Sequence, residues 1–481
     1  MRVCLKRAVR CALAAALLFA AAPSGAEDRS VTLSIPQARS AALAAYSNGD
    51  YALAIQLAKG LLQADPEDPQ AYYIIAHAYS RLGDAGLSRR AAGYAFRYSD
   101  HELDRYNTAQ LAARMALKDE RHTLAQYWLR RSYDYVPNER LRKQAVADFK
   151  LLRAQNPWTV QLGFSVDPSD NVNSGAQDPV NDIDGLDTTP LDLTPSALAL
   201  SGTTVNARVN GAYRLSRSRN AETHLQFHAS TRQVILSREA RQQLQSSPFP
   251  SEQALTGADF SSIYAKIGLS HAFRLGTSPE APKGNGYGRL RAAYAESWYS
   301  GQRYFRAYSL EAERGFRLSG SRNLSLAAEV TRRNYDRPNR ESTTGELSAV
   351  LRQDLAGGDQ LALGLSVAET ESDYGNFRKR RAALHLGYDV GRKIGPAKLS
   401  FVIGASLSEY PEYRLLTGLF TLTTLQREDK SLFGGVTVHF EDYGFAGFAP
   451  TLSLRGRKTE SNVGRFDTEE MTLSIGLRSN F

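Results

Sequence analysis

The feature that most restricts the fold is the alternation of apolar and polar residues in the C-terminal two thirds of the chain. In the last such segment Met471, Leu473, Ile475, Leu477 and Phe481 alternate with polar residues or glycine. Side chains point to opposite faces along a β-strand, so this segment has one apolar and one polar face. Beyond residue 26 the chain has no run of eighteen apolar residues, although a membrane-spanning helix requires roughly that length. The pattern therefore favours amphipathic strands.

The same alternation predicts fourteen strands in a transmembrane antiparallel β-barrel over residues 156–481. An even number is typical of single-chain bacterial barrels whose two ends lie on one side of the membrane. The alternative is a soluble β-sandwich or β-solenoid, but sandwich strands are usually about five to six residues long and these are longer. The strands are expected to begin near Trp158, Thr203, Ala221, Asp259, Tyr287, Tyr304, Asn323, Ser342, Gln360, Phe377, Ala397, Asp429, Phe448 and Phe466.

The connections between these strands alternate in length, which predicts their sides. Residues 216–220, 319–322 and 356–359 are tight turns rich in Gly, Ser or Asn, as expected at the periplasmic end of a barrel. Residues 168–202, 237–258 and 411–427 are longer and are expected outside the cell. The terminal Phe481 resembles the assembly signal of outer-membrane barrels, which implies outer-membrane lipids and the barrel assembly machinery as partners.

The first 26 residues are typical of a cleaved secretory signal peptide. Four basic residues precede the apolar run 11–22, and Ser24-Gly25-Ala26 forms a small-residue cleavage site. Both cysteines, Cys4 and Cys11, lie in this leader, so the mature chain is expected to have neither a disulfide nor a reactive thiol. Cleavage lowers the formal charge of +9 to about +5. That excess is too small to indicate nucleic acid as a partner.

Residues 27–155 predict a periplasmic α-solenoid of tetratricopeptide repeats. Gly83 follows Gly49 by thirty-four residues, each glycine precedes an Asp that opens the second helix of a unit, and Asp65-Pro66 ends the first unit. A third, degenerate unit is expected over 103–137, with a capping helix over 138–153.

The concave face of this solenoid is the candidate partner-binding surface. It would serve as a groove for a protein segment or a polysaccharide, or else it is a spacer whose exposed residues are merely solvated. The residues expected to point into it are Arg39, Tyr46, Tyr73, His77, Arg81, Asn107 and Arg114.

No motif predicts an enzyme, a cofactor or a bound metal. His224 and His228 are four residues apart on a strand, roughly 13 Å from each other, so they cannot share one ion without other ligands. The acidic segment 178–192 offers carboxylates for calcium outside the cell, but it lacks the spacing of a calcium-binding EF loop, so a solvated loop is the favoured interpretation. Gly284 to Gly288 precedes a strand instead of a helix, so it is interpreted as a turn and not as a phosphate-binding loop.

The residues expected to face the barrel lumen are rich in arginine. A basic lumen would attract anions or acidic polypeptides, or Arg–Glu pairs would simply brace the wall. The expected cations are Arg208, Arg214, Arg232, Lys266, Arg289, Arg291, Arg317, Arg333, Arg352, Arg381, Arg455 and Arg457, and the anions are Glu311, Glu313, Glu329, Glu346 and Asp389.

A leader, a short repeat domain and a fourteen-stranded barrel together resemble the surface lipoprotein assembly modulator (Slam) family, the translocons of the type 11 secretion system. Asn171 and Asn173, in Asp170-Asn171-Val172-Asn173, are similar to an Asn-x-Asn element near the start of that family's barrel. The resemblance implies that the barrel moves lipoproteins or soluble proteins to the cell surface and that the repeats receive this cargo. An exopolysaccharide export porin and a general diffusion porin with a periplasmic docking domain are the alternatives.

Overall fold

The computed structural model describes residues 32–184, 191–276, 285–336, 339–416, 421–443 and 448–479. The expected leader and Phe481 lie outside the described residues and stay predictions. The chain divides into two compact units, residues 1–120 and 121–481. Packing thus separates the chain at residue 120, whereas the functional boundary expected at residue 155 stays a prediction.

Paired helices make up the described part of the first unit, as the repeat pattern predicts. Gly49 and Gly83 have φ angles of 86° and 87°, a backbone conformation that other residues adopt only with strain. Asp50 and Asp84 then cap the next helices by accepting hydrogen bonds from backbone N–H groups. The helices are α2 (Ile35–Ser47), α3 (Tyr51–Ala64), α4 (Pro69–Leu82), α5 (Ala85–Tyr98) and α6 (Glu102–Lys118).

Alanines allow the helices of this unit to pack closely. Ala54, Ala58, Ala76, Ala92 and Ala112 are fully buried, because a methyl side chain lets neighbouring helix backbones approach one another. No helix in the described ranges combines the length and the apolar character needed to cross a membrane.

The second unit begins with the helical hairpin α7 (His122–Tyr133) and α8 (Glu139–Gln155), which leads directly into the first strand. Arg214 of the strand β4 (Gly202–Arg217) donates hydrogen bonds to the carbonyl oxygens of Ala154 (2.9 Å) and Gln155 (2.7 Å), and Arg217 donates to that of Ala154 (3.0 Å). Two cations therefore stabilise the carbonyl end of α8. The hairpin packs as part of the barrel unit.

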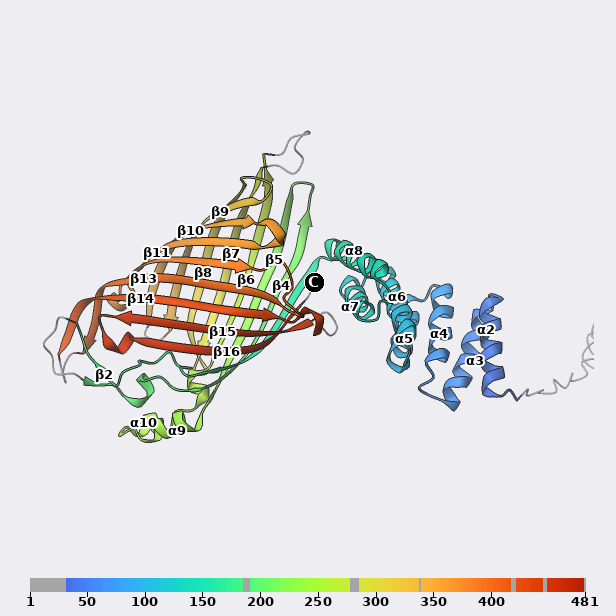
Figure 1. Ribbon diagram of the computed structural model, residues 1–481, viewed down its shortest axis with the longest axis horizontal. Helices are drawn as coiled ribbons and strands as arrows, with labels where there is room; N and C mark the ends of the chain where they lie inside the picture. Colours follow the sequence, from blue (N-terminus) through green and yellow to red (C-terminus); the bar gives the residue numbers. More distant parts are fainter. Residues whose placement is uncertain are drawn as a thin grey trace, which may run out of the picture. The chain divides into compact units, whose positions relative to one another are not determined.

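The closed barrel has fourteen antiparallel strands, so the predicted fold class is confirmed. Each strand of the barrel pairs with its neighbours in the sequence, and β1 closes the barrel against β16. Figure 1 shows β13, β14, β15 and β16 side by side in this order. The strands are β1 (Trp158–Ser169), β4 (Gly202–Arg217), β5 (Ala221–Leu236), β6 (Ser262–Leu275), β7 (Gly286–Tyr299), β8 (Gln302–Arg317), β9 (Arg322–Asp336), β10 (Asn339–Asp354), β11 (Gln360–Ser372), β12 (Lys379–Asp389), β13 (Lys398–Leu416), β14 (Leu422–His439), β15 (Phe448–Ser461) and β16 (Thr468–Ser479).

One expected connection is largely strand. β13 extends to Leu416 and β14 begins at Leu422, whereas residues 411–427 were expected to form a loop. A register shift between Tyr410 and Tyr413 allows pairing with β14 to continue past the bend. Beyond the apolar belt both faces of this hairpin carry polar residues, so alternation no longer marks the strands there.

The two ends of the barrel differ in the length of the connections between strands. Short turns, including 218–220, 318–321 and 355–359, lie at the end where β1 begins, here called the short-turn end. Residues 170–201 and 237–261 connect strands at the opposite end, the long-loop end. The latter segments contain elements not expected from the sequence: β2 (Val180–Asn181), β3 (Leu191–Asp192), η1 (Pro195–Ala197), α9 (Arg238–Gln245), α10 (Pro250–Gln253) and η2 (Gly257–Phe260).

Apolar side chains cover the outer wall of the barrel. Leu310, Leu347, Leu432 and Ile475 are 67, 61, 59 and 55 % exposed, respectively. Such exposure of large apolar residues is expected where the surrounding medium is hydrocarbon and not water. The inner faces of the same strands carry the polar residues of the site.

Candidate functional site

A cavity of about 1530 Å³ lies along the inner wall formed mainly by β13–β16, β1, β4 and β5. Its residues extend from Asp389 and Lys398, near the short-turn end, to Asp167 and Arg232, near the long-loop end. The cavity therefore follows the height of the wall. Serine, threonine and asparagine are frequent among its lining residues, as expected for a hydrated lumen.

Ion pairs brace another part of the wall, formed by β7 and β8. Arg289 lies 2.9 Å from Glu313, and Arg291 lies 2.7 Å from Glu311 and 2.8 Å from Glu313. The tyrosine hydroxyl of Tyr287 also donates to Glu313. These neighbouring strands thus neutralise each other's charges, so the bracing interpretation fits Arg289 and Arg291.

The cavity wall differs, because three of its arginines have no carboxylate partner in the part of the chain that the structure describes. Arg208 on β4 and Arg455 and Arg457 on β15 line the cavity and are exposed to it. Among the described residues none of the three forms an ion pair, and Arg457 instead lies over the ring of Phe433 at 5.3 Å from its centroid. Attraction of anions is therefore the interpretation that fits these three positions.

Three other arginines predicted to face the lumen donate hydrogen bonds to other residues of the chain. Arg214 holds α8, as described above, and Arg232 donates to the carbonyl oxygens of Val172 (2.6 Å) and Phe260 (3.2 Å). Arg333 donates to the hydroxyl of Thr344 at 3.1 Å. These arginines therefore position loops and strands.

A folded cap covers the inner side of β5 at the long-loop end. We define the cap as residues 170–184, 191–201 and 237–261. Its apolar core joins Val172 and Leu200 to Ala240 and Leu244 of α9, with Phe260 of η2 completing it. The core packs on Val234 and Leu236, which share the face of β5 that bears the lumen residues His228 and Arg232. The cap therefore folds towards the lumen.

The two asparagines of the family-like motif organise the cap. Asn171 is 2 % exposed; its amide donates to Gly175 O (2.9 Å) and accepts from Gly175 N (2.8 Å). Asn173 donates to Ser196 O (3.0 Å) and Leu198 O (2.7 Å) and accepts from Leu200 N (2.9 Å). Both side chains thus replace backbone hydrogen bonds that the irregular segment lacks.

The cap also contacts the turn between β15 and β16. Ile183 pairs with Val463, which is fully buried, and Asn181 accepts a hydrogen bond from the backbone of Arg465. The turn between β15 and β16 also contains Phe466, in the short helix η6 (Gly464–Phe466). Its ring centroid lies 3.2 Å from the guanidinium carbon of Arg427, so packing continues from β5 round to β14.

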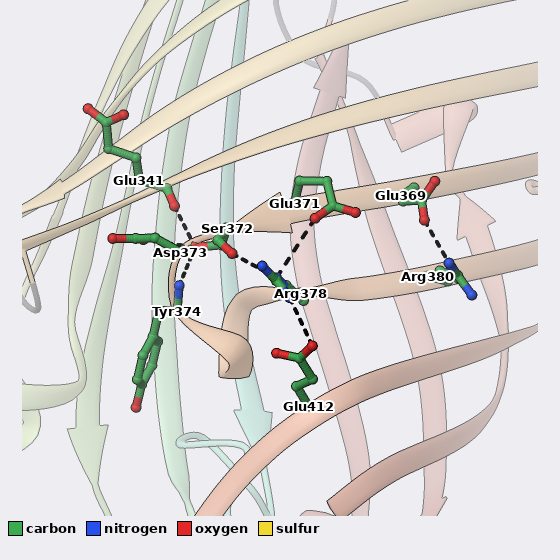
Figure 2. Close-up of polar contacts among 9 residues, drawn as sticks. All are labelled: Glu341, Glu369, Glu371, Ser372, Asp373, Tyr374, Arg378, Arg380 and Glu412. Carbon is green, nitrogen blue, oxygen red and sulfur yellow. Dashed lines mark hydrogen bonds and ion pairs between the residues drawn. The ribbon is translucent and has the colours of Figure 1, made fainter. Parts of the chain in front are cut away.

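Ion-paired residues of β11, β12 and β13 lie at the long-loop end of the barrel. Figure 2 shows Arg378 between Glu371 and Glu412, at 3.8 and 2.9 Å, and Arg380 beside Glu369 at 2.9 Å. Glu369 on β11 and Arg380 on β12 share the outer face of their strands with the exposed apolar residues Val367 and Leu384. The two charged residues lie nearer to the long-loop end than these apolar residues. These ion pairs mark the place where the apolar belt ends on β11 and β12.

Several residues expected on the concave face of the repeats lie together. The rings of Tyr73 and His77 are 4.3 Å apart, and those of Tyr46 and His77 are 6.2 Å apart. Burial, aided by the nearby Arg114 and Arg81, lowers the pKa of His77. A hydrogen bond with Tyr46 raises the pKa of Arg81. The aromatic rings and the two arginines therefore form one cluster, here called the repeat cluster.

The other two residues of this set behave differently. Arg39 forms an ion pair of 2.6 Å with the buried Asp68, the residue that caps α4. Asn107 is exposed on α6. Arg39 therefore has a structural contact between helices, and whether any residue of the set binds a partner stays a prediction.

The described residues hold no group of three or more His, Cys, Asp or Glu side chains placed to bind a metal. The Nδ1 atom of His228 lies 2.6 Å from Asn210, and Nε2 of His224 lies 3.8 Å from Glu222. Asp187, in the middle of the acidic segment, lies outside the described residues.

Residues 270–481 match the family model of the surface lipoprotein assembly modifiers, which confirms the expected resemblance over the larger part of the barrel. No curated protein matches the chain.

Among solved structures, the type III secretion translocator chaperone SycD of Yersinia enterocolitica is 17 % identical over 26 % of this chain and 88 % of its own, with a TM-score of 0.23. OccAB3 of Acinetobacter baumannii is 9 % identical over 66 % of this chain and 98 % of its own, with a TM-score of 0.35. A bacterial polysaccharide outer membrane secretin is 9 % identical over 66 % and 98 %, with a TM-score of 0.31.

Proposed function

Since residues 270–481 match the surface lipoprotein assembly modifiers, we propose that this protein is an outer-membrane translocon that moves partner lipoproteins or soluble proteins from periplasm to cell surface. The family match is the observation that carries the proposal. The elongated cavity beside β1 and β16 supports it, because a polypeptide crossing the membrane inside a barrel needs a continuous hydrated path.

The proposed orientation puts the short-turn end in the periplasm and the cap outside the cell. Short periplasmic turns and long external loops are the rule for bacterial barrels. The first strand begins three residues after α8 ends, so this orientation also leaves the helices in the periplasm. There the repeats would receive cargo.

The cap argues against a general diffusion porin. A pore for small solutes conducts best through an unobstructed mouth, whereas here seven buried apolar residues hold a folded segment on the inner side of β5. An exopolysaccharide export porin remains the competing function. The two functions differ in the molecule that fails to reach the surface when the protein is removed.

The test is a gene deletion followed by surface proteomics. Protease shaving of intact cells should show the loss of one or a few proteins from the surface, with those proteins retained in the periplasm. Unchanged surface proteins together with lost capsule or matrix polysaccharide would overturn the translocon proposal and favour polymer export.

The role of the repeats needs a separate comparison. Tyr73→Ala with His77→Ala disrupts the repeat cluster, while Tyr94→Ala with Tyr98→Ala removes two rings of a different tyrosine stack in the same unit. We expect cargo display to fall only in the first variant. Equal display in both variants would mean that the repeat cluster does not receive cargo.

A further inference from the structure

The unpaired arginines of the cavity wall flank a strip of small residues. Arg208 lies on β4, and Arg455 and Arg457 lie on β15. β1 and β16 separate these strands, which corresponds to a width of roughly 14 Å at the usual strand spacing. The intervening lumen positions on β1 and β16 carry Gly163, Ser165, Thr472, Ser474 and Gly476. Glu470 of β16 stands opposite Arg457 in the strand pairing and accepts a hydrogen bond from Thr472 at 2.9 Å.

The side chain of Arg208 lies across this strip. A Cβ atom at position 163 would lie 2.6 Å from Nε and 2.9 Å from Cγ of Arg208. Any residue larger than glycine at this position would therefore displace the arginine side chain. Glycine at 163 thus allows the guanidinium group to lean from β4 over β1. We call the strip and its three arginines the arginine trough.

The cations Lys398 and Arg232, near the two ends of the cavity, are held by protein groups, unlike the three arginines in its middle. Lys398 pairs with Glu441 at 3.1 Å near the short-turn end, and Arg232 is held by backbone carbonyls at the other end. Near that end, Asp167 accepts a hydrogen bond from Asn206 at 2.8 Å. The three arginines at mid-height are the cavity's cations that lack such partners among the described residues.

We propose that the arginine trough binds an extended, carboxylate-rich segment of the translocated polypeptide. Guanidinium groups bind carboxylates through two parallel hydrogen bonds, and a floor of small side chains leaves room for an extended chain. Of the aromatic rings that line the cavity, Phe433 lies under Arg457, and Tyr264 lies beside the His228 ring at 5.7 Å on the β5–β6 side, away from the strip. This inference rests on the proposed function, because that function supplies a polypeptide to the lumen.

The test measures binding of a fluorescein-labelled oligo-glutamate of about 20 residues to the purified full-length protein in detergent micelles, followed by fluorescence anisotropy. The trough variant combines Arg208→Gln, Arg455→Gln and Arg457→Gln. The matched control combines Arg303→Gln, Arg332→Gln and Arg380→Gln, which removes the same charge from arginines that pair with acids on other surfaces of the barrel. We expect at least a tenfold weaker affinity in the trough variant and less than a twofold change in the control.

Two further measurements keep the result interpretable. A heat-modifiable shift on gels, identical to that of the natural protein, shows that each variant barrel is folded, and the triple Arg→Lys variant should retain part of the affinity. Salt should weaken binding to the natural protein more steeply than to the trough variant.

Unchanged affinity in the trough variant, or an equal loss in the control, would overturn the proposal. Tighter binding of a uronic-acid oligomer of equal charge would assign the trough to an acidic polysaccharide instead. Binding is measured without cargo or cells, so a negative result here combined with lost protein display in the deletion strain would reject the trough and keep the translocon.

Discussion

Arg427 and Asp429 form a buried pair on the same strand, with Nε of the arginine 2.9 Å from Oδ1 of the aspartate. Both residues are 8 % exposed. The guanidinium group also lies near the rings of Tyr410, Tyr413 and Phe466. This cluster joins the β13–β14 hairpin to the turn before β16, so it connects two hairpins at the long-loop end.

Replacing Asp429 by Asn should loosen that end of the barrel. Loss of one partner leaves a buried guanidinium uncompensated, which costs about 3–5 kcal/mol. In proteoliposomes we expect faster proteolytic cleavage near residues 410–429. Glu428→Gln, at the exposed neighbouring position, should leave the cleavage rate unchanged. The double variant Arg427→Leu, Asp429→Leu should recover most of the resistance; if it does not, the single variant acts through something other than the unpaired charge.

Replacing Asn171 by Ala should detach the first part of the cap. The buried amide makes hydrogen bonds with both backbone groups of Gly175, and leaving these unsatisfied costs about 1–3 kcal/mol. Hydrogen exchange over residues 170–184 should speed up, and channel conductance in a planar bilayer should rise. Asn339→Ala, at an exposed position, is the control. Unaltered exchange in the Asn171 variant would show that the apolar core alone holds the cap.

Replacing both Arg214 and Arg217 by Gln should weaken the attachment of α8. The variant loses three hydrogen bonds to the last carbonyl groups of α8. Because these arginines are partly solvated, we expect the free energy that holds α8 against the barrel to fall by about 1 kcal/mol. Hydrogen exchange over 139–155 reports the change. Arg219→Gln, in the exposed turn, should have no effect there, and equal exchange in both variants would contradict the role given to Arg214.

The repeat unit should lose stability as the pH falls through the titration range of His77. Burial lowers the pKa of this histidine in the folded chain, so the unfolded chain binds more protons below its usual pKa of about 6.5. The neutral His77 side chain therefore stabilises the repeat unit fully above about pH 6.5, the usual histidine pKa. This stabilisation declines as the pH falls towards the lowered pKa that His77 has in the folded chain. The helical melting transition, followed at 222 nm, should move to lower temperature between pH 7.5 and 5.5.

His77→Phe should reduce this dependence, whereas His101→Gln, at the N-terminus of α6, should preserve it. An undiminished shift in the His77 variant would assign the pH dependence to other groups.

Regular elements were predictable from the sequence because their signals are local. A glycine followed by a capping Asp marks each helix turn near residues 49 and 83, and period-two alternation marks the strands. The largest displacement of a strand start, from Asp429 to Leu422 in β14, arises where the apolar face ends. Beyond the belt, the pattern that identified the strands disappears although the hydrogen bonds continue.

The site was harder to predict from the sequence than the regular elements, because its contacts join residues that are far apart along the chain. Asn173 bonds to residues 23 to 27 positions later, and no local pattern indicates that pairing. Ala240 and Leu244 are spaced for one face of a helix, which was the available signal for α9. Four of the predicted lumen arginines, namely Arg208, Arg232, Arg455 and Arg457, line the cavity. Arg289 has Glu313 opposite it on the adjacent strand, whereas Arg208 has Gly163, and no local pattern in the sequence indicates this difference.

The compact unit that contains the barrel begins at residue 121, so it keeps α7 and α8. A graft made at residue 156 would separate α8 from the arginines of β4 that hold its last turn. A splice between residues 120 and 121 would instead leave that hairpin intact. A different repeat array is therefore expected to be joined at this junction without altering the barrel unit, which under the proposed function would supply the barrel with a new receptor.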